Sequence, residues 1–154
     1  MQITTARDRS LLLVRQLRLA EAGTALKEAG ARRVLPLKVS GPFHSPMMRP
    51  AGEELAKVFA RVSMNPLKIP YVANINAEVI TDCGRIEGLL VEQVSGSVRW
   101  QQSVETMIRE WVDTFVEIGP GKTLTGFLRK IDKNVKAYHI GSWEEAVQVC
   151  EELK

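Results

Sequence analysis

The residues best suited to chemistry in this chain are a histidine and its neighbours in Ser40-Gly41-Pro42-Phe43-His44-Ser45-Pro46. Imidazole can take up a proton near neutral pH, so His44 is a candidate general base. Its small and rigid neighbours leave room beside the ring, and the two prolines aim it. Such a base needs a nucleophile, which α/β hydrolytic sites usually present on a Gly-x-Ser-x-Gly elbow. No such elbow occurs in the 154 residues, so the sequence predicts only half of a catalytic apparatus.

Two other features invite a chemical interpretation. The second histidine, His139, lies in a predicted strand, where a structural role is the commoner one. The motif Gly119-Pro120-Gly121-Lys122-Thr123 resembles part of a phosphate-binding P-loop, but that loop needs a glycine at position 116, which is Val116 here. The motif therefore predicts a sharp turn at the carboxyl end of a strand, where α/β sheets hold ligands. Both a purely structural turn and a turn that lines a site remain open.

The elements that would position these residues alternate between helix and strand. Helices are predicted over 10–29, 50–62, 86–94, 103–109 and 122–131, and strands over 33–39, 69–73, 112–118 and 135–140. A last helix begins at Ser142, which has capping-box spacing to Glu145. This alternation predicts an α/β fold with a mostly parallel sheet and helices on its faces. His44 would follow the first strand of that sheet.

Composition narrows the class of protein. The chain is 45% apolar and 25% charged with a net charge of +3, which is typical of one globular domain with an ordinary core. Basic and aromatic residues are not interleaved, so a nucleic-acid partner is not expected. No apolar run is long enough for a membrane helix, and the first residues lack a secretory signal, so we expect a cytoplasmic protein. Cys83 and Cys150 stand alone in sequence, which disfavours a metal site.

Four motifs together point to a family. Their order and spacing resemble malonyl-CoA:acyl-carrier-protein transacylases and the related acyltransferase domains of fatty-acid and polyketide synthases. The resemblance runs from about Ala20 to the C-terminus and covers the C-terminal half of the family's usual chain. The motifs are Ser40 to Met48, Val72 to Ala77, Val98 to Trp100 and Glu117 to Leu124.

The resemblance implies a fold and a reaction. Residues 35–154 would be the C-terminal part of a hydrolase-like acyltransferase domain, and residues 1–34 a remnant of the family's small ferredoxin-like subdomain, of which 1–19 are atypical. The family transfers malonyl from malonyl-CoA to the phosphopantetheine thiol of acyl carrier protein, in fatty-acid or polyketide synthesis. It does so through a serine acyl-enzyme and without a cofactor or metal.

The resemblance also assigns roles to four residues. His44 would be the general base, and the backbone carbonyl of Gln93 would orient it in place of the aspartate of a Ser-His-Asp triad. Phe43 would crowd a methyl group on the acyl chain and so favour malonyl. Asn74 would lie near the active-site cleft.

The family's serine, its carboxylate-binding arginine and its oxyanion-hole glutamine belong to upstream segments that this sequence lacks. We therefore expect a truncated chain that is inactive alone, with catalysis possible only if a complementary N-terminal chain supplies the serine. The alternative is a non-catalytic module that binds CoA or carrier protein. Lys122, Arg129 and Lys130 would then contact an acidic partner. A hydrolase built on Ser40 or Ser45 is disfavoured, because neither serine lies on a strand-to-helix elbow.

Overall fold

The computed structural model describes residues 2–6, 9–12, 18–35 and 41–154. At the N-terminus, β1 (Gln2–Ala6) pairs antiparallel with β2 (Arg9–Leu12), and α1 (Leu19–Glu28) follows. The first predicted helix is therefore wrong over its beginning, because part of it pairs as β2. Gly30 does end α1, with a left-handed φ of 91° that glycine adopts without strain. Residues 33–35 form no strand, and the rest of the strand predicted over 33–39 lies outside the described residues.

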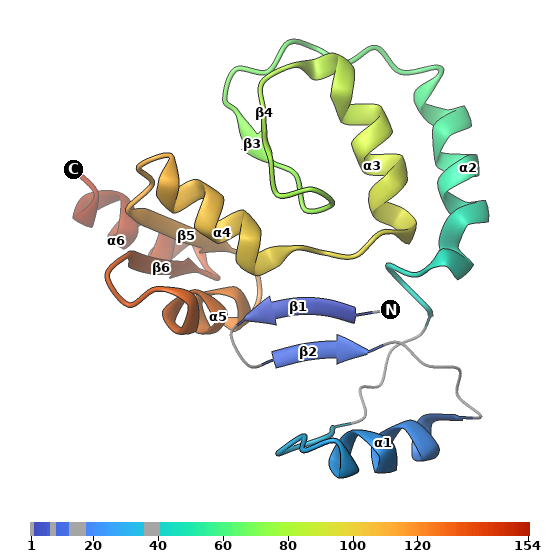
Figure 1. Ribbon diagram of the computed structural model, residues 1–154. Helices are drawn as coiled ribbons and strands as arrows, with labels where there is room; N and C mark the ends of the chain where they lie inside the picture. The colour runs from blue at the N-terminus through green and yellow to red at the C-terminus, as the bar shows by residue number, and fades with distance from the viewer. Residues whose placement is uncertain (1, 7–8, 13–17, 36–40) are drawn as a thin grey trace.

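A pair of helices forms the next layer (Figure 1). The short 3₁₀ turn η2 (Pro46–Met48) leads into α2 (Arg49–Phe59), which packs along α3 (Ile86–Ser95). Pro50 sits in the first turn of α2, where its missing N–H costs nothing. The two helices come close at Gly52, where an added Cβ would lie 3.1 Å from the carbonyl oxygen of Val91. Close packing at Gly52 thus sets the position of α3 relative to the turn that carries His44.

A small antiparallel ribbon lies beside these helices. It consists of β3 (Tyr71–Val72) and β4 (Val79–Ile80), and the short 3₁₀ turn η3 (Cys83–Arg85) connects it to α3. The strand predicted over 69–73 is thus present in shortened form, whereas β4 was not predicted. The side chain of Asp82 accepts a hydrogen bond from Gly84 N at 2.8 Å and so fixes the turn before α3.

The C-terminal region carries the parallel sheet. The order is α4 (Trp100–Arg109), β5 (Thr114–Ile118), α5 (Thr123–Ile131), β6 (Lys136–Ile140) and α6 (Trp143–Glu152). Strands β5 and β6 pair in parallel from Thr114 opposite Lys136 to Ile118 opposite Ile140. A core cluster of Val104, Leu128 and Ile131 joins α4 to α5. The predicted α/β class is confirmed, and within the described residues parallel pairing is limited to β5 and β6.

The capping of α6 agrees with the prediction in part. Ser142 Oγ accepts a hydrogen bond from Glu145 N at 3.3 Å, as a capping box requires. The Glu145 carboxylate, however, accepts from Gly141 N at 2.6 Å and not from the cap residue itself. The helix start is therefore fixed by both side chains, although the box is shifted by one residue.

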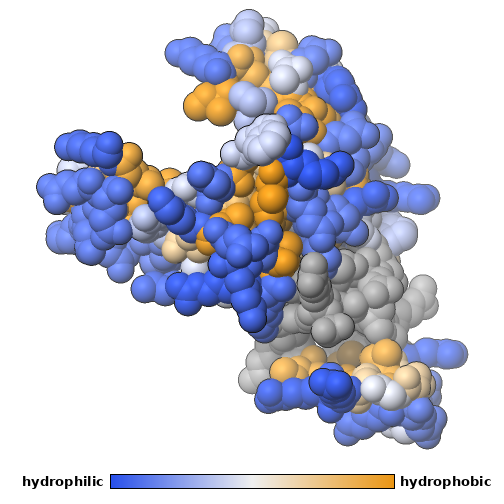
Figure 2. Space-filling view, turned by 60° about the vertical axis from the view of Figure 1, so that its left-hand side comes forward, coloured by the Kyte–Doolittle hydropathy of each residue, from blue (hydrophilic) through white to orange (hydrophobic). Residues whose placement is uncertain are grey.

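Large apolar side chains stay uncovered over several elements. Ile118 and Trp143 are each 78% exposed, and Ile69 is 76% exposed. Figure 2 shows apolar side chains gathered along the inner side of a concave outline. Such uncovered surface is unusual for a chain that functions by itself and is typical of surface that contacts another segment. Among the described residues, no helix is both long and apolar enough to cross a membrane.

Candidate active site around His44

The turn after Gly41 presents His44 in an uncommon backbone conformation. His44 has a φ of 57°, in the left-handed region that non-glycine residues seldom adopt. The turn holds this conformation through Ser45, whose buried hydroxyl donates to Pro42 O at 2.7 Å, while Met48 N donates to Ser45 O at 2.9 Å. Backbone conformations of this kind cluster at functional sites, where the surrounding structure maintains them.

The imidazole of His44 contacts the end of α3. Its Nδ1 lies 2.9 Å from the backbone carbonyl oxygen of Gln93. A carbonyl oxygen can only accept, so this hydrogen bond places the ring proton on Nδ1 and leaves the lone pair on Nε2. Gln93 lies in the last turn of α3, where backbone carbonyls have no partner within the helix and carry the negative end of its dipole. The arrangement suits a base that becomes positively charged during a reaction.

The side chain of Gln93 lies against the same ring. Its Nε2 donates to Gly96 O at 3.2 Å and stands 3.3 Å from His44 Nδ1. Both nitrogens are donors when Nδ1 carries the proton, so the second approach is packing and not a hydrogen bond. Gln93 thus contacts His44 in two ways. Its backbone oxygen accepts the hydrogen bond from Nδ1, and its side-chain amide packs against the same edge of the ring.

The two other predicted site residues differ in their surroundings. Phe43 is 51% exposed, and its ring bends back over Gly41, where an added Cβ would lie 3.4 Å from the ring. Asn74 is exposed, and its backbone oxygen accepts from Arg99 N at 2.8 Å. The structure brings Asn74 and Gln93 to one pocket, whereas Phe43 does not line it.

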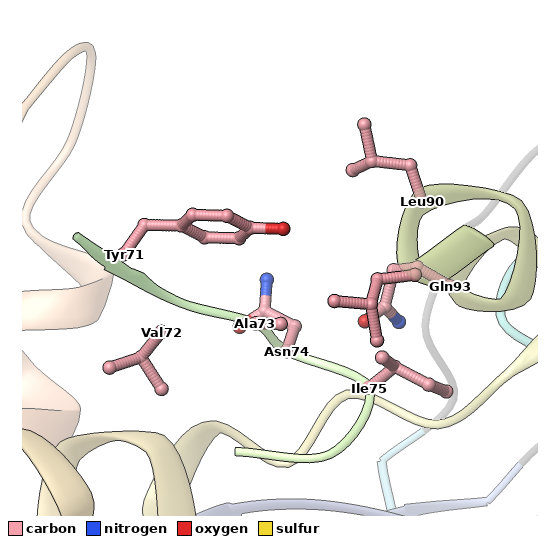
Figure 3. A pocket seen from close by; sticks show the side chains of 8 residues that line it. Tyr71, Val72, Ala73, Asn74, Ile75, Leu90 and Gln93 are labelled. Carbon is pink, nitrogen blue, oxygen red and sulfur yellow. The ribbon is translucent and has the colours of Figure 1, made fainter. Parts of the chain in front are cut away.

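This pocket lies between β3 and α3 (Figure 3). Its apolar walls and polar groups come from two segments, Tyr71 to Ile75 together with Leu89, Leu90 and Gln93. Two of its polar atoms, Tyr71 Oη and Gln93 Oε1, are buried without a hydrogen-bond partner in the described part of the chain. Tyr71 carries no signal of this role in the sequence, because a tyrosine in an apolar strand is ordinarily a core residue and the surroundings of its hydroxyl show only in three dimensions.

The second histidine lies at the carboxyl end of the parallel strands. His139 Nε2 is 2.9 Å from Gly119 O, and Nδ1 is 3.5 Å from Glu145 Oε2, within ion-pair range but without a hydrogen bond. Its ring is 9% exposed. The backbone N–H of Gly141 is the main cause that lowers the pKa of Glu145. His139 thus holds the Gly119-Pro120-Gly121 turn against β6 and α6.

A carboxylate closes the same turn from the other side. Glu117 accepts from Leu124 N at 3.0 Å and Thr125 N at 2.8 Å, and Thr125 Oγ1 donates to it at 2.6 Å. The hydroxyl of Thr125 is the main cause that lowers the pKa of Glu117. A strand carboxylate therefore caps the following helix α5, and the glycines at 119 and 121, with φ of 136° and 88°, make the turn possible.

Known proteins resemble the chain over most of its length. It is 38% identical to a malonyl CoA-acyl carrier protein transacylase of Bacillus subtilis over 133 residues, which are 86% of this chain. It is 40% identical to a malonyl CoA-acyl carrier protein transacylase of Staphylococcus aureus over 119 residues, which are 77% of this chain. It spans only 42% and 39% of those two relatives. No family model matches the sequence.

Solved structures agree with the sequence relatives. A malonyltransferase from Bartonella henselae matches with a TM-score of 0.81 at 37% identity, over 88% of this chain and 43% of that one. A malonyl-transacylase solved in complex with a type II polyketide acyl-carrier protein matches with a TM-score of 0.84 at 33% identity, over 89% and 44%. The fold described above is thus shared with one part of these larger enzymes.

Proposed function

We propose that this chain belongs to the malonyl CoA-acyl carrier protein transacylase family, whose members it matches over less than half of their length, and that it is the portion that carries the general base. The observation that carries the proposal is the hydrogen bond from His44 Nδ1 to Gln93 O. It leaves Nε2 free to accept a proton, with a carbonyl in place of a buried carboxylate as orienter. In this proposal, residues 35–154 form part of the large acyltransferase domain, and residues 1–34 derive from the small one.

The proposed reaction has two half-reactions, and in each of them His44 Nε2 takes up a proton and then gives it away. First, a serine from another segment attacks the thioester carbonyl of malonyl-CoA while Nε2 takes its hydroxyl proton, and CoA leaves as the thiol after receiving that proton. Second, the phosphopantetheine thiol of acyl carrier protein gives its proton to Nε2 and attacks the acyl-serine. The serine then leaves and recovers the proton. No cofactor enters these steps.

The nucleophile in this proposal comes from outside the chain. Ser45 is the serine next to the base, but its hydroxyl is buried and donates to Pro42 O. Ser40 lies outside the described residues. A complementary N-terminal segment would supply the serine, and the uncovered apolar side chains of Ile69 and Ile118 would give it a surface to cover. Phe43 would line the acyl pocket only in that assembled state, with Asn74 beside the cleft.

The proposed macromolecular partner is acyl carrier protein, and the proposed place of action is the cytoplasm. One structural relative is a transacylase solved with a carrier protein, which supports this choice by analogy. Lys122, Arg129 and Lys130 are exposed on and before α5, so they are free to meet an acidic partner. The same three residues favour the second candidate function, a module that binds CoA or carrier protein without turnover.

Complementation with a serine-bearing segment tests the proposal. The purified chain would be mixed or co-expressed with the N-terminal part of the Bacillus subtilis relative, and malonyl transfer from malonyl-CoA to carrier protein would be measured. We expect no transfer by either part alone, transfer by the mixture, and a loss of about a thousandfold or more with His44→Ala. His139→Ala serves as the matched control and should retain most of the activity.

Two results would contradict this function. Transfer that survives His44→Ala would remove the histidine from the mechanism. Carrier-protein binding by the chain alone, together with an inactive mixture in which both parts are shown to associate, would favour the non-catalytic module. Either outcome can be read from the same preparations.

A further inference from the structure

Two buried polar atoms that have no hydrogen-bond partner among the described residues come from opposite walls of one pocket. Tyr71 Oη comes from β3 and Gln93 Oε1 from α3, and both line the same cavity. Figure 3 shows the tyrosine ring reaching across from its strand toward α3, with its hydroxyl in the pocket. Unpaired buried polar atoms are rare, because each forfeits the hydrogen bonds that water would have given it.

The two atoms are chemically complementary. A tyrosine hydroxyl can donate, and an amide oxygen can only accept. The two atoms are not hydrogen-bonded to each other directly, and one ordered water that bridges them would satisfy both at once. Asn74 is the third polar residue of the pocket, but it is exposed, so bulk water can serve its amide. The pairing that the burial pattern requires is therefore between Tyr71 and Gln93.

The pairing matters because of what Gln93 does on its other side. Its backbone oxygen accepts from His44 Nδ1 at 2.9 Å, and its side-chain Nε2 packs 3.3 Å from the same nitrogen while donating to Gly96 O. The side chain thus covers the Nδ1–H···O=C hydrogen bond and keeps water away from it. Because Gln93 Nε2 donates to Gly96 O, Oε1 is the amide atom that has no hydrogen bond among the described residues.

We propose that Tyr71 is a positioning residue for His44 and acts through the side chain of Gln93. Tyr71 anchors Gln93 Oε1, the anchored amide shields the bond from Nδ1 to Gln93 O, and the shielded bond keeps the proton on Nδ1. Without the anchor, the Gln93 side chain turns toward solvent and water competes for the Nδ1 proton. The tautomer with the proton on Nε2, which cannot accept a further proton at that atom, then becomes more populated. The catalytic meaning rests on the proposed function, whereas the structural coupling does not.

The chain offers clean variants for the test, since it has two histidines and two tyrosines. Nitrogen-15 spectra of the imidazoles of the ¹⁵N-labelled chain report the tautomer, and His139→Gln assigns the His44 signals. We expect the Nε2-protonated fraction of His44 to rise about two- to tenfold in Tyr71→Phe, the range that loss of one hydrogen bond gives. Tyr138→Phe is the matched control and should leave His44 unchanged.

A second pair of variants isolates the route of the coupling. Gln93→Leu keeps the backbone carbonyl and removes only the amide, so it should reproduce the effect of Tyr71→Phe, and the double variant should add nothing further. Unchanged His44 spectra in Tyr71→Phe, or a full additional effect of Tyr71→Phe in the Gln93→Leu background, would overturn the proposal. The spectra are recorded on the chain alone and require no acyl transfer. A failure of the complementation assay is therefore distinguishable from a failure of this coupling.

Discussion

The chain holds two histidines whose surroundings differ in almost every respect. His44 lies at the tip of a turn with a left-handed φ of 57°, and its contacts on Nδ1 are both with Gln93. His139 lies inside β6 with extended pairing, one nitrogen bonded to Gly119 O and the other facing Glu145. The ring of His44 is held through Nδ1 and leaves Nε2 available, whereas the ring of His139 is largely buried, bonds Gly119 O through Nε2 and turns Nδ1 toward a carboxylate without a hydrogen bond.

The difference shows how a histidine that can act as a base is distinguished from a structural histidine. A structural histidine is placed by regular structure, and its ring is buried and tied to a neighbouring backbone carbonyl, as His139 is to Gly119 O. A base needs an orienting contact on one nitrogen and access on the other, and strained backbone is tolerated to achieve it. The separation can be tested by asking which variants damage the fold and which leave it intact.

The largest expected change in stability comes from a glycine beside the His44 site. In Gly96→Ala, the new Cβ would overlap Ile75 Cδ1 and lie 2.9 Å from Glu92 O. We expect a loss of about 1–3 kcal/mol of unfolding free energy. Gly126→Ala in α5, where nothing lies within 4 Å, should instead gain about 0.5–1 kcal/mol. Urea denaturation of both variants checks the ranking, and equal stability would show that the Gly96 region can relax.

The two histidines themselves give the next contrast. His139→Asn removes the hydrogen bond to Gly119 O and places a poor strand former in β6, so we expect it to destabilise the chain by about 1 kcal/mol. His44→Asn loses its bond to Gln93 O but puts a residue that tolerates left-handed φ into the turn, so it should be nearly neutral. Thermal melts by circular dichroism measure both. The reverse order would remove the structural distinction between the two sites.

The smallest expected effect concerns the carboxylate near His139. Hydrogen bonds, first from the Thr125 hydroxyl, lower the pKa of Glu117 below its ordinary value of 4.5. Its contribution to stability is therefore complete above that ordinary value and lost as the pH falls through the lower folded pKa. Glu117→Gln should lower the melting temperature at pH 7, and the two curves should converge in acid. Curves that stay parallel down to pH 2 to 3 would show that the ionised carboxylate is not the stabilising form.

Sequence patterns predicted the C-terminal region well and the N-terminal region poorly. The helix after Gly121 and the strand that contains His139 follow from apolar periods that tertiary packing reinforces, so β5, α5 and β6 lie close to their predicted bounds. Near the N-terminus, a leucine period suited both helix and strand, and pairing with β1 decided for β2. The two-residue strand β4 has too short a pattern to be recognised.

The candidate site was predictable only in part, and for a physical reason. His44 stands out by residue type and by its rigid neighbours, whereas Gln93 is suggested only by resemblance, because a backbone carbonyl leaves no mark in sequence. Tyr71 is not recognisable from sequence either, because its proposed role follows from a buried hydroxyl that has no hydrogen-bond partner among the described residues. Chemistry carried by side chains can be found from sequence, but chemistry carried by backbone atoms and burial cannot.

The use of a helix-end carbonyl to hold His44 constrains the length of α3 in addition to the side chain at position 93. Any residue at position 93 would present the same oxygen, so a substitution there spares the acceptor and removes only the amide that covers it. A single residue inserted into α3 between Gly88 and Gln93, by contrast, would rotate the helix end by about 100° and carry the carbonyl away from the ring. Evolution of this contact would therefore be recorded in the length of α3 up to Gln93, where a single insertion or deletion breaks a contact that most single substitutions in the helix leave in place.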